Sequence, residues 1–101
     1  ERRRLIGPLL DRLVERAREQ RAVRDDFTVG DLSMAMWSFA PIFEATADVA
    51  PQAWRRHLQI VLDGMRPEAA TPQTARPLAP RQLERAMEAL RERYHRRRAA
   101  A

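Results

Sequence analysis

Few side chains in this sequence are placed to carry out chemistry. His57 and His95 are the only histidines, and His57 follows two arginines, which disfavours a bound cation there. Glu44 and Asp48 lie one helical turn apart without a histidine or third carboxylate nearby, which is typical of a solvated helix end. There is no HExxH sequence, Ser–His–Asp candidate or glycine-rich phosphate loop. We therefore predict no enzyme activity, no metal and no cofactor, and assign His57 a hydrogen-bonding role in an interface or pocket.

The composition indicates one small globular domain. The chain has 101 residues, of which 45% are hydrophobic and 33% charged, and it has no cysteine. A disulfide framework and a thiolate metal site are therefore excluded. No apolar run reaches the roughly 18 residues that span a bilayer, and no signal-peptide pattern opens the chain. We expect a cytoplasmic protein that does not contact the membrane.

The net charge of +5 is concentrated near the C-terminus. Up to Arg66 there are 11 arginines and 10 acidic residues, and from Pro67 onward 8 arginines and 4 acidic residues. All 19 basic residues are arginine, which is typical of a GC-rich coding sequence. The densest cluster is Arg96–Arg98. We interpret the arginines as a solvated surface and keep phosphate binding as an alternative.

The segment from Leu32 to Phe43 is the most informative part of the sequence. It carries no charge and contains two methionines, a tryptophan and two phenylalanines. A helix that is apolar on every side must be buried on every side. One small subunit can hardly surround it, so the segment predicts a subunit interface or an apolar cavity. The residues chosen for a ligand-binding wall are Met34, Trp37 and Phe43. Those chosen for the dimer interface, on the next helix, are Trp54, Leu58, Val61, Leu62 and Met65.

Apolar residues at steps of three and four predict an all-α fold with four helices. The first helix should end near Ala22. It starts either with Pro8 in its first turn or further upstream. Thr28 should cap a second helix over 29–46, with Asp31 in place of the Glu or Gln of a full capping box.

Prolines mark the later boundaries. Pro41 should kink the second helix, and Pro51 should open a third over 51–66. Residues 67–79 contain several prolines and no periodicity, as expected for a linker. From Pro80 a fourth, amphipathic helix is predicted, with an Arg-rich tail to residue 101. Its apolar stripe consists of Leu83, Met87, Leu90 and Tyr94.

Several passages resemble the C-terminal domains of TetR-family transcriptional regulators. They are LLDRLVERA at 9–17, AVRDDFTVGDL at 22–32, WRRHL at 54–58 and LDGMRP at 62–67. The linker and the LAPRQL sequence at 78–83 resemble a subgroup with a C-terminal extension. Gly30 departs from the pattern, because an acidic residue usually stands before Asp31.

The resemblance implies a bacterial regulator that is a homodimer, with an N-terminal helix-turn-helix domain followed by an effector-binding domain. Residues 1–66 would be the regulatory and dimerisation helices, and the second and third helices would form a four-helix bundle with their counterparts. The implied partners are a second copy and a hydrophobic small-molecule effector, with DNA bound only through the N-terminal domain. Because the chain begins at Glu1 without an initiator methionine, we expect a fragment or a processed protein.

Two other interpretations stay open. One is a helical protein–protein adaptor without a small-molecule ligand, in which the apolar second helix binds a different protein. The other is a nucleic-acid-binding module that acts through the arginine tail. A basic helix-turn-helix segment before Glu1 would favour the regulator, and binding that falls steeply with salt would favour the nucleic-acid module.

Overall fold

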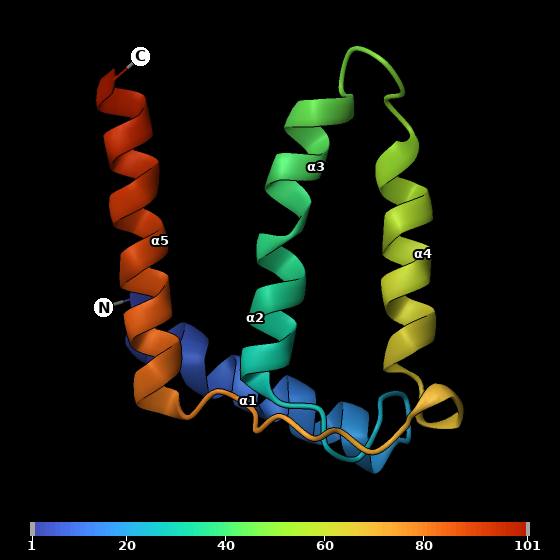
Figure 1. Cartoon of the computed structure of the whole chain (residues 1–101). Helices are drawn as coiled ribbons and strands as arrows, with labels where there is room; N and C mark the ends of the chain where they lie inside the picture. Colours follow the sequence, from blue (N-terminus) through green and yellow to red (C-terminus); the bar gives the residue numbers. More distant parts are fainter. Residues whose placement is uncertain (1, 101) are drawn as a thin grey trace.

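A computed structural model describes residues 2–100 of the chain (Figure 1). Its elements are α1 (Arg2–Glu19), α2 (Val29–Trp37), α3 (Phe39–Thr46), α4 (Ala53–Met65), a short 3-10 helix η1 (Pro67–Ala69) and α5 (Pro80–Ala100). No strand occurs among these residues. The all-α fold and its four predicted helices are confirmed, with the second helix divided into α2 and α3.

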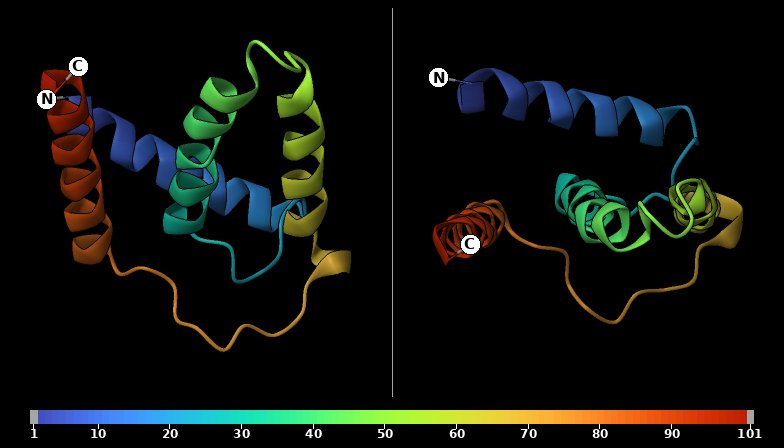
Figure 2. Two further views of the ribbon diagram at one scale, coloured as in Figure 1. Left: turned by 45° about the horizontal axis from the view of Figure 1, so that its top comes forward. Right: turned by 90° about the horizontal axis from the view of Figure 1, so that it is seen from above.

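The helices stand in a row with one helix crossing behind it. α2 and α3 follow each other upward, α4 returns beside them, and α5 stands on their other side (Figure 1). α1 crosses behind the lower ends of this row, and the view from above places it on one face only (Figure 2). Among the helices of residues 2–100, none covers the opposite face of the α2–α3 and α4 pair (Figure 2).

Helix α1 starts upstream of Pro8 and stops earlier than predicted. The alternative of an upstream start is the correct one, since the helix runs from Arg2 through Pro8 to Glu19. Its end is a Schellman motif, in which the Ala22 N–H donates to the Ala17 carbonyl at 2.9 Å and the Arg21 N–H to that of Arg18 at 3.0 Å. Arg21 has a φ of 57°, so the left-handed turn ends the helix before the predicted Ala22.

We expect Arg21→Gly to stabilise the fold. A residue with a Cβ is strained in the left-handed conformation, whereas glycine adopts it freely. The gain should be up to about 1 kcal/mol in the free energy of unfolding, measured by urea denaturation. Arg21→Ala removes the same charge and keeps the strain, so it should give no comparable gain. Equal midpoints for the two variants would contradict this explanation.

The start of α2 is a complete capping box, as Thr28 and Asp31 predicted. The Asp31 N–H donates to the Thr28 hydroxyl at 3.2 Å, and the Thr28 N–H donates to the Asp31 carboxylate at 3.0 Å. Gly30 is buried, and a Cβ there would lie 3.2 Å from that of Leu78. The linker therefore explains why glycine replaces the acidic residue usual at this position.

The helix is interrupted at Ser38, close to Pro41, but the sharp kink predicted for this proline is not seen. Pro41 has no N–H to donate to the carbonyl of Trp37, four residues earlier. The Ser38 hydroxyl donates to the carbonyl of Ala35 at 2.6 Å. The backbone of Ser38 stays close to helical geometry, with φ of -70° and ψ of -18°. The two helices therefore continue in nearly one direction.

The C-terminal segments follow the prolines. α4 begins at Ala53, two residues after Pro51, and residues 70–79 have no regular structure beyond bends. α5 begins at Pro80 as predicted, where the Ala79 N–H donates to the Gln82 side chain at 2.9 Å. Within the part of the chain that the structure describes, no helix is long and apolar enough to cross a membrane.

The hydrophobic core lies where α1 meets the loop before α2. Its buried side chains are Val14, Val23 and Phe27, and partly buried neighbours are Ala17, Val29, Leu32 and Met65. The chain is correspondingly open, with a radius of gyration of 15.5 Å against about 13 Å for a compact domain of this length.

Candidate functional site

Neither histidine belongs to a catalytic or metal-binding cluster in residues 2–100. His57 Nε2 lies 3.3 Å from the Ser38 hydroxyl, and its ring meets Phe39 edge-on with centroids 5.0 Å apart. His95 lies on α5, where its ring is 6.4 Å from that of Tyr94. No three metal-ligating side chains gather among the described residues. His57 thus joins α4 to the break between α2 and α3.

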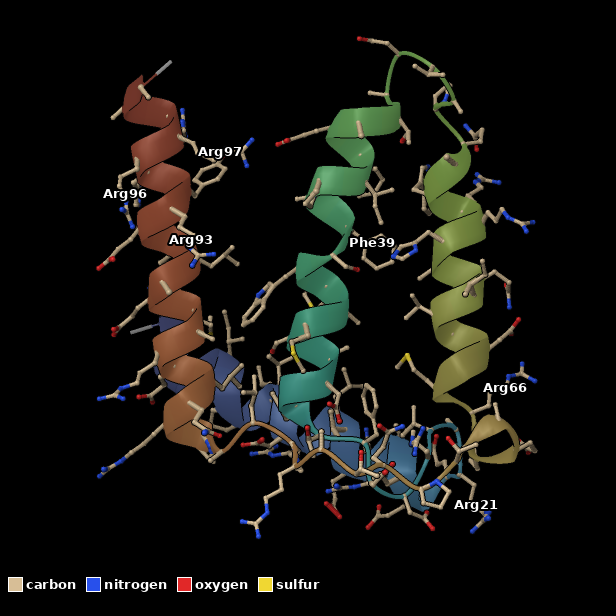
Figure 3. All side chains as sticks on the ribbon, viewed as in Figure 1. Arg21, Phe39, Arg66, Arg93, Arg96 and Arg97 are labelled. Atoms are coloured by element: carbon tan, nitrogen blue, oxygen red, sulfur yellow. The ribbon has the colours of Figure 1, made fainter. Side chains whose placement is uncertain are left out.

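An aromatic cluster holds α3 against α4. The ring centroids of Phe39 and Phe43 are 6.1 Å apart, and those of Phe43 and Trp54 are 6.0 Å apart. Phe39 points into the space between the two helices (Figure 3). The Arg55 guanidinium lies 5.4 Å from the Trp54 ring centroid. These contacts make α2–α3 and α4 an antiparallel pair that can present one shared face.

The five residues predicted for the dimer interface do not all point the same way. Met65 packs against the core, Trp54 against Phe43, and Leu58 and Val61 are half-buried. Leu62 is different, because 45% of it is exposed. Ile60 is also exposed, and helical geometry places it on the opposite flank of α4 from Leu62.

The three residues predicted for a ligand-binding wall occupy different sides of α2–α3. Phe43 is 45% exposed and shares a side with the exposed Met36, seven residues earlier. Met34 is exposed on the opposite side, and Trp37 is half-buried between them. None of the three lines the groove that α1, the start of α2 and α5 form together.

That groove has a volume of about 900 Å³ and lies between α1, the start of α2 and α5. Its apolar wall on α1 comes from Ile6, Leu10 and Val14, and its wall on α5 comes from Leu83 and Met87. Leu78 joins the two walls at the base. Sequence reasoning missed the groove because its walls are about 70 residues apart, although the stripe on each helix was visible.

Charged side chains border the groove and fix the linker. Arg18 donates to the Phe27 carbonyl at 3.0 Å and pairs with Glu15 at 2.7 Å. Further along, the Arg24 N–H donates to the Met65 carbonyl at 2.8 Å, and its guanidinium bonds the Asp26 carboxylate and the Thr71 carbonyl. The hydrogen bond from Arg24 lowers the pKa of Asp26. Arg24 thereby ties the end of α4 and the linker to the core loop.

The fold and its aromatic helix pair define an all-α domain, and its family is shown by comparison with known proteins. Residues 2–67 match the family described as "Transcriptional regulator SbtR-like, C-terminal domain". The chain belongs to this family, a group of C-terminal domains of TetR-type regulators. The predicted family resemblance is therefore confirmed. No curated protein and no solved structure matches the chain. α5 lies outside the matched residues.

Proposed function

We propose that the chain is a ligand-responsive dimerisation domain, in which α2–α3 and α4 pack against the same helices of a second copy. The observation that carries this proposal is the large solvent-accessible surface of the single chain. The chain exposes 8789 Å², whereas a folded monomer of 11.7 kDa exposes about 5,900 Å². The excess is more than the roughly 800 Å² that each partner buries in a standard interface.

The uncovered face of the α2–α3 and α4 pair is suited to this contact. α1 lies on one side of the pair only (Figure 2). Exposed apolar side chains include Met34 on α2 and Leu62 on α4. A two-fold axis would place the same surface of both copies face to face and form an isologous four-helix bundle. The dimer would also supply stability that a three-residue core cannot give alone.

The proposed effector is an apolar small molecule at α2–α3. Met34 and Trp37, which are neighbours on the helix surface, would line one wall, and Phe43 would contribute from a separate side. Half-exposed aromatic and methionine side chains are suited to such a ligand. Operator DNA would be bound by the DNA-binding domain of the parent regulator. The effector would change DNA binding only if it binds two states of the dimer with different affinity.

The melting temperature at different chain concentrations tests the dimer. When folding and association are coupled, a hundredfold rise in concentration adds about 2.7 kcal/mol to the stability of the dimer. For two chains of this size we expect the melting temperature to rise by about 5 °C. A melting temperature that stays constant over this range would contradict coupled dimerisation.

A further inference from the structure

The second half of α5 is exposed along its whole described length. Every residue from 88 to 100 is exposed, including two large apolar side chains, Leu90 at 44% and Tyr94 at 55%. Their helix stands apart from the row formed by α2–α3 and α4 in both views (Figures 1 and 2). Arg93, Arg96 and Arg97 lie on the same free part of the helix (Figure 3). The stripe that begins in the groove thus continues without cover.

The spacing of this stripe is that of a helix that pairs with another helix. Leu83, Met87, Leu90 and Tyr94 follow each other at steps of four, three and four, which are the a and d positions of a heptad repeat. In the same register, Glu84 and Arg91 occupy e positions beside the seam. Both are exposed, and neither forms an ion pair among the described residues.

The charges beside the seam distinguish the two orientations of a self-pair. In an antiparallel pair, e positions face e positions, so Glu84 lies near Arg91 of the partner subunit, and the contact occurs twice by symmetry. A parallel pair would instead bring Arg93, at a g position, against Arg98 of the partner subunit. The charges therefore match the antiparallel arrangement.

Space and surface area agree with a second copy of α5 as the occupant. The groove of about 900 Å³ keeps Leu83 and Met87 only half-buried, so the side chains of another helix can enter along it. The chain also exposes about 2,900 Å² more than a monomer of its mass, which is more than one standard interface covers. Two separate contacts between subunits would cover this excess surface better than one contact would.

We propose that α5 is a second self-association element, which pairs antiparallel with α5 of another copy. Leu83 would lie opposite Tyr94, and Met87 opposite Leu90, with two Glu84–Arg91 ion pairs at the sides. This contact is separate from the uncovered face of the α2–α3 and α4 pair. A chain that uses both faces forms a tetramer from two dimers when the two-fold axes of the two contacts intersect. The α5 proposal does not depend on the dimer proposed above.

Charge reversal in the full-length chain tests the pairing. Glu84→Arg or Arg91→Glu alone places like charges together twice, and should weaken assembly of the dimer into the tetramer about tenfold at low salt. The double variant Glu84→Arg/Arg91→Glu restores opposite charges and should recover the assembly. Glu88→Arg and Arg85→Glu make the same changes outside the seam and serve as matched controls. Sedimentation velocity at several concentrations measures the effect.

The outcomes separate the two proposals. Single reversals that weaken assembly, with recovery in the double variant and none in the controls, support the α5 pair. If all variants assemble to the same extent as the wild type, the α5 pair is overturned, and the groove is then filled by the chain's own helices or by a small molecule. Equal weakening by seam and control variants also overturns it, because the effect is then general electrostatics. If the α2–α4 dimer fails, a monomer that pairs through α5 and responds to these reversals still supports it.

Discussion

Phe27→Ala should remove most of the stability of the fold. Phe27 is 6% exposed and is the largest of the three buried core side chains. Truncation of a buried phenylalanine costs about 3–5 kcal/mol, and small domains have a total stability at the lower end of about 5–15 kcal/mol. The other two core residues, Val14 on α1 and Val23 in the loop before α2, are held in different segments and would not fill the cavity that the missing ring leaves. We expect loss of helical circular dichroism at room temperature, or a much lower urea midpoint.

Phe43→Ala is the matched control for this variant. It makes the same change on α3, where 45% of the side chain is already exposed, so its effect on the stability of a single subunit should be clearly smaller. The two variants are compared at one low concentration, so that association contributes equally to both. Similar loss of stability in both variants would mean that the core does not lie at the α1–α2 corner.

Leu62→Glu should break the contact through α2–α3 and α4, so that any association that remains is the α5 pair and responds to Arg91→Glu. Leu62 is exposed in the subunit, so the glutamate costs the isolated fold little. In an isologous interface it would bury two carboxylates, one from each copy, without a basic partner. We expect the dimer dissociation constant to rise at least about 100-fold, measured by sedimentation equilibrium.

Ile60→Glu is the control on the same helix. Ile60 is also exposed but lies on the opposite flank of α4. Its replacement should leave dimerisation close to that of the wild type. A Leu62→Glu variant that remains dimeric while Ile60→Glu becomes monomeric would move the interface to the other flank. Association that is unchanged in both variants and does not respond to Arg91→Glu would exclude α4 from the interface.

The local signals of the sequence predicted the helices well. Thr28 with Asp31 located the start of α2, and Pro41 and Pro80 located the break at Ser38 and the start of α5. Each of these features depends on hydrogen bonds between residues close in sequence, so the residue types alone are enough to predict it. The end of α1 was misplaced because a non-glycine residue, Arg21, takes the left-handed conformation.

Long-range features could not be predicted in the same way. Val23 and Phe27 read as a connection between helices, yet they form most of the core with Val14. The groove requires residues near 10 and near 85 to come together. Two contacts set the path of the linker that allows this: Leu78 packs against Gly30, and the Arg24 guanidinium donates to the Thr71 carbonyl. Neither contact has a periodic signature in the sequence. The roles of Met34, Trp37 and Phe43 in ligand binding stay predictions.

The most direct test of the account is native mass spectrometry of the purified wild-type chain over a range of micromolar concentrations. We expect dimers, and tetramers where α5 pairs as well, because the uncovered face of α2–α3 and α4 and the large exposed surface need a second copy to cover them. A tightly bound small mass on the dimer would support the proposed effector. A monomer at every concentration would contradict the account.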